Sequence, residues 1–255
     1  MIFIDTHCHL YLDDFAEDIL EIIQRADYEG VKKFFLPAID SNSFPQLMNL
    51  EKKFPGVCIP MAGLHPCSVK ENYKEELRFV EKNLSEGSYA AVGEIGLDFY
   101  WDRSFEKEQY EAMHTQVEWA LEHDIPIVIH SRESIQQTIG LVKEHQRGRL
   151  KGIFHCFNDS YQSAREIIDL GFYMGIGGVI TYKNSTLPGV VKQIDLEHFV
   201  LETDAPYLTP VPFRGKRNES SYIKFIAGKL AELKSINIEE VAAVTSANAE
   251  KIFGR

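Results

Sequence analysis

Cysteine is scarce in this chain of 255 residues, which has only Cys8, Cys58, Cys67 and Cys156. No two of them form a C-x-x-C pair, and four cysteines are too few for a disulfide scaffold. We therefore expect reduced thiols and a cytoplasmic location.

Long apolar runs are also missing, since none approaches the roughly 18 residues that span a bilayer. The first residues, MIFIDTHCHLYLDDF, lack the positive region and the long apolar stretch of a signal peptide. No stretch is rich in proline, glycine or serine, and none is of low complexity. We expect no membrane association and one domain over residues 1–255.

Basic residues are outnumbered, with 27 lysines and arginines against 38 acidic residues and a net charge of −11. A chain this acidic does not coat nucleic acid or an anionic membrane through bulk charge. If the substrate carries phosphates, a local device such as bound metal must supply the positive charge. The 44% hydrophobic and 25% charged residues are ordinary for a folded protein and exclude a disordered chain.

Short apolar segments recur along the chain, and most are unbroken, as expected of parallel strands covered on both faces. Eight of them are predicted as strands: 2–5, 33–37, 57–62, 90–95, 126–130, 152–155, 172–177 and 199–203. Because a (β/α)8 barrel typically has about 250 residues, this number of strands predicts an α/β fold with a TIM-like barrel. A doubly wound open sheet is the alternative, but it usually has fewer strands.

Helical spacing of apolar residues separates these strands and predicts helices over 14–29, 105–123, 163–170 and 222–233. Gly30 and Gly171 follow two of these segments and are expected to act as C-terminal caps. The last segment, 238–252, is expected to be an extra helix that closes the barrel.

Histidine and acidic residues gather at the carboxyl ends of the predicted strands, namely at His7, His9, Glu94, His130, His155 and Asp204. Because these strand ends open at one mouth of a barrel, the six side chains should converge. Residues two apart on a strand point to the same side, so His7 and His9 should face the mouth and Cys8 should face away.

Imidazoles and carboxylates are the usual ligands of Zn²⁺ and related ions, and this set also admits Mn, Mg, Fe or Ni. Six such groups exceed the needs of one tetrahedral ion, so we predict two divalent metal ions bridged by Glu94. A turn or capping role would account for Glu94 or Asp204 alone, but it would have to explain six positions separately. The remaining histidines lie in helical or loop stretches and are interpreted as ordinary polar residues: His114, His123, His145 and His198.

Several motifs are specific in combination: DTHCHL (5–10), GLHP (63–66), GEIGLDFYW (93–101), PIVIHSR (126–132), FHCF (154–157) and ETDAPYLTPVPFRGKRNES (202–220). With these motifs the chain resembles, essentially end to end, the TatD family of metal-dependent deoxyribonucleases within the amidohydrolase-like barrel superfamily. The resemblance implies hydrolysis, often of DNA phosphodiesters. It also implies that one metal is held by His7, His9, Glu94 and Asp204, and the other by Glu94, His130 and His155.

Two ions about 3.5–4 Å apart lower the pKa of a shared water and stabilise the attacking and leaving oxygens. On this hypothesis a metal-activated water attacks phosphorus, Asp204 takes its proton, and Glu94 sets the spacing of the ions. The expected substrate-binding residues are basic side chains near the mouth, namely His65, Arg132, Arg214, Lys216 and Arg217. The alternatives are loop bracing for His65 and a solvated loop for 214–217.

For other residues near the mouth, the sequence leaves two possible roles open. Glu202 and Asp5 share strand parity with Asp204 and His7, so each either supports the site from behind or pairs within the barrel. Asp98 either orients a ligand or caps the following helix. Four aromatic residues either stack on bases or pack into the core: Phe99, Tyr100, Trp101 and Tyr207.

Three functions fit these residues: a nuclease acting on DNA single strands or ends, a hydrolase of a small amide, lactone or phosphoester, and a non-enzymatic scaffold. Glu94 argues mildly against the second, since many relatives of that kind bridge their metals with a modified lysine on strand four. Six ligands that bind nothing would cost stability, which argues against the third. We therefore favour DNA as the substrate and expect no obligate protein partner.

Overall fold

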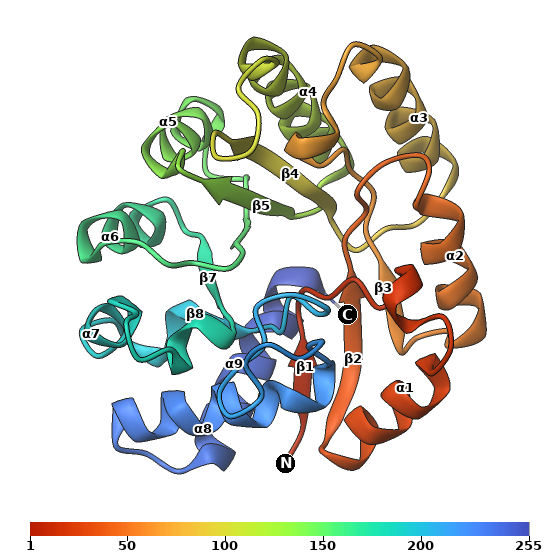
Figure 1. Ribbon diagram of the computed structural model, residues 1–255. Helices are drawn as coiled ribbons and strands as arrows, with labels where there is room; N and C mark the ends of the chain where they lie inside the picture. Colours follow the sequence, from red (N-terminus) through yellow and green to blue (C-terminus); the bar gives the residue numbers. More distant parts are fainter. Residues whose placement is uncertain (255) are drawn as a thin grey trace.

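The computed structural model describes residues 1–254 and places eight parallel strands inside a ring of helices (Figure 1). The strands are β1 (Phe3–Asp5), β2 (Val31–Leu36), β3 (Cys58–Pro60), β4 (Val92–Asp98), β5 (Ile127–Arg132), β6 (Gly152–Phe154), β7 (Tyr173–Ile176) and β8 (Phe199–Leu201). Each overlaps one of the predicted strands, so the predicted TIM-like barrel is confirmed and the open sheet is excluded.

The helices are α1 (Ile19–Tyr28), α2 (Phe44–Lys53), α3 (Tyr73–Glu86), α4 (Glu106–His123), α5 (Ile135–His145), α6 (Tyr161–Asp169), α7 (Leu187–Val191), α8 (Ile223–Lys234) and α9 (Ile238–Phe253). Short 3₁₀ turns cover Asp13–Phe15, Pro66–Ser68, Gly178–Thr181, Leu196–His198 and Ser220–Tyr222. None of the helices described is both long and apolar enough to cross a membrane.

Two helix boundaries differ from the prediction for local reasons. The helix expected over 14–29 begins only at Ile19, because residues 13–15 form a separate 3₁₀ turn that buries Phe15. The helix expected over 163–170 begins at Tyr161, because the Ser160 hydroxyl accepts a hydrogen bond from the Ser163 amide at 3.1 Å. The predicted caps Gly30 and Gly171 both have positive φ, at 93° and 80°, which confirms them.

Hydrogen bonds close the barrel at the two places where the strand ladders are interrupted. β1–β2–β3 and β4–β8 form two parallel groups, and an isolated bridge between Ala62 and Val92 joins β3 to β4. On the other side, the Thr6 amide donates to the Leu201 carbonyl at 3.0 Å and joins β1 to β8. The strand ends therefore form a closed ring with one carboxyl mouth.

Alternate residues of each strand divide between two apolar clusters. Phe34 and Leu36 of β2 pack outward under the helices, whereas Phe35 between them points into the barrel. Helix α9 covers the amino-terminal end of the barrel, where Phe253 stacks on Phe35 with ring centroids 3.9 Å apart. Figure 1 shows the chain ending near the centre of the ring, as expected of a helix that closes the barrel.

Candidate metal centre

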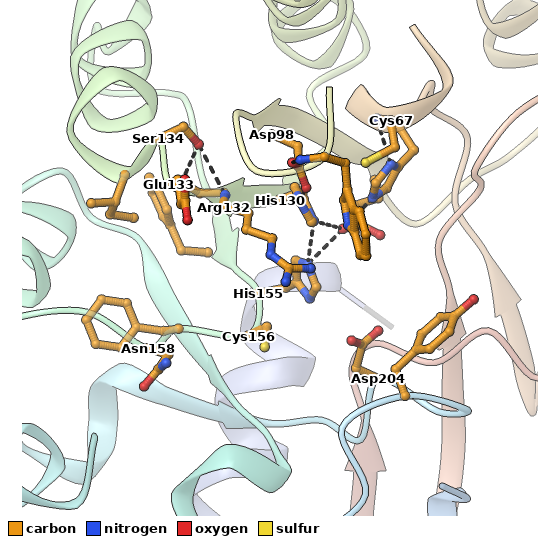
Figure 2. A pocket seen from close by; sticks show the side chains of 18 of the residues that line it. Cys67, Asp98, His130, Arg132, Glu133, Ser134, His155, Cys156, Asn158 and Asp204 are labelled. Atoms are coloured by element: carbon orange, nitrogen blue, oxygen red, sulfur yellow. Dashed lines mark hydrogen bonds and ion pairs between the residues drawn. The ribbon is translucent and has the colours of Figure 1, made fainter. Parts of the chain in front are cut away.

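The carboxyl ends of the strands open into a cavity of about 1180 Å³, which five of the six predicted ligands line. His7, the sixth, lies fully buried beneath it, with its Nε2 atom 3.3 Å from Nε2 of His9. Cys8 between them is buried on the other side, against the Phe35 carbonyl, as the alternation predicted. Side chains from five strand ends therefore converge on one place, and Figure 2 shows His130, His155 and Asp204 around it.

Glu94 of β4 stands between two pairs of histidines. Its Oε2 atom lies 3.1 Å from Nε2 of His7 and 3.6 Å from Nε2 of His9. Its Oε1 atom lies 2.8 Å from Nδ1 of His130 and 2.7 Å from Nε2 of His155. One carboxylate oxygen faces each pair, so this single side chain lies between the two pairs of histidines.

Asp204 completes the group around His7 and His9, with its Oδ1 atom 3.7 Å and 3.6 Å from their Nε2 atoms. Its backbone adopts a φ of 55°, which is uncommon outside glycine and is held here by a hydrogen bond from its amide to the His7 carbonyl. This conformation brings the carboxylate over the histidines.

The donor set fits divalent metal ions. Three groups of side chains place their ligand atoms within 4.8 Å of one another: His7–His155–Asp204, His7–His9–Glu94 and His65–Glu94–His130. All donors are nitrogen or oxygen, as Zn²⁺, Mn²⁺ and similar ions prefer. The Nε2 atoms of His7 and His155 face Glu94, while their Nδ1 atoms lie on the far side of each ring, buried without a hydrogen-bond partner.

The electrostatics of the centre favour a charged bridge. Burial alone would raise the pKa of Glu94, but the surrounding histidines, His155 foremost, hold it well below its usual range. Burial and the neighbouring His7 lower the pKa of His9, so its ring is neutral. Burial raises the pKa of Asp204 to about 7, against the opposing effect of His7 and His155.

The outer partner of His9 fixes which of its nitrogens faces the centre. Nδ1 of His9 lies 3.0 Å from the Tyr11 hydroxyl, which itself donates to the Pro37 carbonyl at 2.6 Å. Because the hydroxyl donates its single proton to the carbonyl, it can only accept from His9, and Nδ1 of His9 must carry a proton and donate it to Tyr11. Nε2 then carries the lone pair that a metal needs. Tyr11 was missed from the sequence, although it continues the two-residue spacing of His7 and His9.

Asp98 orients a proposed ligand, His130, but it does not cap the following helix, which begins at Glu106. The Oδ2 atom of Asp98 lies 2.9 Å from Nε2 of His130, while Oδ1 accepts hydrogen bonds from the amides of Tyr100 and Trp101. Burial would raise the pKa of Asp98, but these hydrogen bonds, that of His130 first, lower it to about 2. The carboxylate thus orients His130 and anchors the loop after β4.

Glu202 and Asp5 separate into different roles. Oε1 of Glu202 lies 3.6 Å from Nδ1 of His155 and so backs that ring from behind. Gly175 leaves the space for this carboxylate, since a Cβ atom there would come within 2.0 Å of Oε2. Asp5 instead accepts hydrogen bonds from Thr203 and Ser220, and so joins β1 to the segment after β8.

His65 has the opposite tautomer to His9. Its Nδ1 atom accepts a hydrogen bond from the Cys67 amide at 3.0 Å, so Nε2 carries the proton. That Nε2 atom lies 3.4 Å from Oε1 of Glu94. His65 therefore presents an N–H donor to the cavity rather than a lone pair.

Arg132 lines the cavity at the end of β5 and extends toward His155 in the view of Figure 2. Its guanidinium carbon lies 3.8 Å from the Tyr100 ring centroid and 5.1 Å from that of Trp101. Among residues 1–254 it makes no ion pair. Its donors are therefore available to an anion.

The other three predicted basic contacts lie away from the cavity. Arg217 forms a two-pronged ion pair with Asp18, with the shorter contact at 2.6 Å. Arg214 lies over the Tyr182 ring at 3.8 Å, and Lys216 lies over the ring of Phe213 at 5.7 Å. None of the three is among the lining residues, because the loop after β8 carries them outward.

The remaining histidines lie outside this centre. His114 and His145 face each other across α4 and α5 with nitrogens 2.7 Å apart, and His145 also pairs with Glu118. His123 ends α4, and His198 lies in the turn before β8. Their interpretation as ordinary polar residues agrees with these positions.

Comparison with known proteins gives matches over nearly the whole chain. Residues 4–254 match the family described as TatD related DNase. The chain is 37% identical over 98% of both lengths to "Uncharacterized metal-dependent hydrolase YabD" of Bacillus subtilis. It is 31% identical to "Putative deoxyribonuclease tatdn3" of Danio rerio, covering 99% of this chain and 97% of the other. The crystal structure of the Escherichia coli TatD homologue YjjV superposes with a TM-score of 0.93 at 30% identity, covering 99% and 98% of the chains.

Proposed function

This chain belongs to the TatD family of metal-dependent hydrolases, and from that premise we propose that it is a deoxyribonuclease with a dinuclear metal centre. The proposed substrate is DNA, cleaved at phosphodiester bonds of single strands or ends. The observation that carries the proposal is the division of Glu94 between two histidine pairs, one at each carboxylate oxygen.

In this proposal one ion is held by His7, His9, Glu94 and Asp204, and the other by Glu94, His130 and His155. When bound, the two ions supply Lewis acidity to the phosphate and lower the pKa of water. The requirement for local positive charge follows from the net charge of −11, which would otherwise repel a polyanion.

The chain's own residues supply proton transfer and orientation. Asp204 is 13% exposed toward the cavity, where its carboxylate accepts a proton from the attacking water. The Nε2–H of His65 donates to an oxygen of the phosphate. Arg132, which has no carboxylate partner among the described residues, binds a neighbouring phosphate through its fork of donors.

Two further observations support a DNA substrate. The cavity of about 1180 Å³ exceeds the usual volume of a site for a small molecule, roughly 300–1,000 Å³, and accommodates more than one nucleotide. The Danio rerio relative is named "Putative deoxyribonuclease tatdn3", and the matching family is described as "TatD related DNase".

The test is cleavage of an end-labelled single-stranded oligodeoxynucleotide with added Mg²⁺ or Mn²⁺, with and without chelator. We expect stepwise shortening that Glu94→Gln reduces roughly 100-fold or more, since even partners behind metal ligands are worth 10–100-fold. Glu86→Gln on the exposed end of α3 makes the same chemical change away from the cavity and should retain full activity.

Intact oligonucleotide in the presence of protein with measured bound metal would overturn the DNA assignment. Lactone, amide and small phosphoester substrates would then be the next to assay. Equal cleavage by wild type and Glu94→Gln would overturn the assignment of the centre itself.

A further inference from the structure

Two large aromatic rings stand exposed at the mouth of the cavity. Trp101 is 68% exposed and Tyr100 is 49% exposed, directly after β4. Phe99, which precedes them, is buried and packs in the core. Exposed large apolar side chains gathered at the edge of a cavity are typical of a binding surface.

The backbone that carries these rings is anchored beside the proposed metal ligands. The amides of Tyr100 and Trp101 donate to one oxygen of Asp98, at 3.0 and 3.1 Å. The other oxygen of Asp98 holds His130. A ligand that touches the rings is therefore placed beside the proposed metal ligands.

Arg132 adds a positive charge to the same surface. Its guanidinium covers the face of Tyr100, and the Trp101 ring stands edge-on to Tyr100 at an interplanar angle of 83°. One face of the Tyr100 ring is thus covered by Arg132, while most of the Trp101 surface stays exposed. An open aromatic face beside an unpaired guanidinium matches a nucleotide, which has an aromatic base and a phosphate.

We propose that Tyr100, Trp101 and Arg132 form a nucleotide subsite, in which Trp101 stacks on an unpaired base and Arg132 binds the phosphate of that nucleotide. The subsite rests on the proposed function for the identity of the polymer. Stacking requires an exposed base face, so the subsite selects single-stranded or frayed ends over intact duplex. Because every base has such a face, it is tolerant of sequence.

Fluorescence tests the subsite without any cleavage. The chain has two tryptophans, and Trp119→Phe leaves Trp101 as the sole one. Titration of the Zn²⁺-loaded Trp119→Phe protein with a cleavage-resistant phosphorothioate oligodeoxynucleotide should quench this fluorescence in a saturable manner. An abasic oligomer with the same number of phosphates should bind with little quenching.

Kinetics on natural single-stranded DNA gives the second test. Stacking worth about 1–3 kcal/mol per base predicts that Trp101→Ala raises KM about 5- to 150-fold with a smaller change in kcat. Trp101→Phe should retain much of the affinity. Tyr28→Ala removes an aromatic ring that is 88% exposed on α1, outside the cavity lining, and should leave KM unchanged.

The outcomes separate this inference from the function on which it rests. Cleavage of DNA with no quenching and an unchanged KM in Trp101→Ala would overturn the subsite and leave the nuclease. Base-dependent quenching without DNA cleavage would uphold the subsite and overturn the nuclease. Equal quenching by abasic and normal oligomers would show a phosphate contact alone and would also overturn base stacking.

Discussion

Hydrogen-bond partners outside the centre determine which ring nitrogen a histidine presents to it. Tyr11 backs His9, and Asp98 backs His130. Such outer partners fix the tautomer and orientation of a metal-binding imidazole. The chemistry of the centre therefore depends on residues that a metal never touches.

Removal of the Tyr11 hydroxyl tests this dependence. Tyr11→Phe deprives Nδ1 of His9 of its acceptor and allows the proton to move to Nε2, where it blocks a metal. We expect metal affinity, measured by calorimetry, to fall about 10–100-fold. Tyr73→Phe removes a hydroxyl that bonds to Glu111 far from the cavity and serves as the matched control. Unchanged affinity in Tyr11→Phe would refute the tautomer assignment.

For single residues, the sequence predicts where the candidate ligands lie better than it predicts which nitrogen of each histidine carries the proton. The six candidate ligands converge because parallel strands share one carboxyl end, and that follows from strand order alone. The tautomers of His9 and His65 depend on Pro37 and Cys67, whose contacts are set by loop paths. These contacts cannot be predicted from the residue spacing within one segment of the sequence.

Ion pairs tie the segment after β8 to α1 and to the residue that precedes it. Arg25 binds Glu219 through two contacts at 3.0 and 2.7 Å, beside the pair of Arg217 with Asp18. Arg217, which was predicted to bind phosphate, thus pairs with Asp18 of the same chain. The sequence shows both charges, but it does not show that α1 and this loop are neighbours.

The Arg25–Glu219 pair should make stability dependent on pH. Burial would raise the pKa of Glu219, but Arg25 and Ser221 lower it below 4.5. The stabilisation is therefore present above that ordinary value and is lost as pH falls through the lower pKa of the folded state. We expect Glu219→Gln to lower the free energy of unfolding by about 1–2 kcal/mol at pH 7, since Arg25 is half exposed.

Urea denaturation between pH 7 and pH 3 measures this effect. The difference between wild type and Glu219→Gln should shrink as pH falls below about 4.5. The exposed Glu86→Gln variant should follow wild type throughout. A difference that stays constant with pH would show that packing, and not the ion pair, accounts for the loss.

At the scale of the whole molecule, the two ends of the barrel have different roles, one in stability and one in the proposed function. Helix α9 covers the amino-terminal end of the barrel, while the metal centre occupies the carboxyl end. The sequence predicts an extra helix over 238–252 that closes the barrel. The direct stacking of Phe253 on Phe35 depends on strand tilt and was not predictable from spacing.

Loss of the Phe253 ring should therefore destabilise the fold without altering the centre. Phe253→Ala creates a cavity in a cluster that is almost completely buried, and we expect a loss of about 3–4 kcal/mol. Metal affinity, measured below the unfolding transition, should remain that of wild type. Leu20→Ala, at a position 56% exposed, should cost under about 0.5 kcal/mol. A parallel fall in metal affinity would contradict the separation of the two ends.

The central claim is that Glu94 joins two ions in one centre. Electron paramagnetic resonance of the Mn²⁺-loaded protein tests it most directly, with the bound metal counted per chain. The account predicts two ions per chain and the spectrum of a spin-coupled pair, which Glu94→Gln replaces with that of isolated ions or abolishes. A single ion per chain, or uncoupled ions in the wild type, would contradict it.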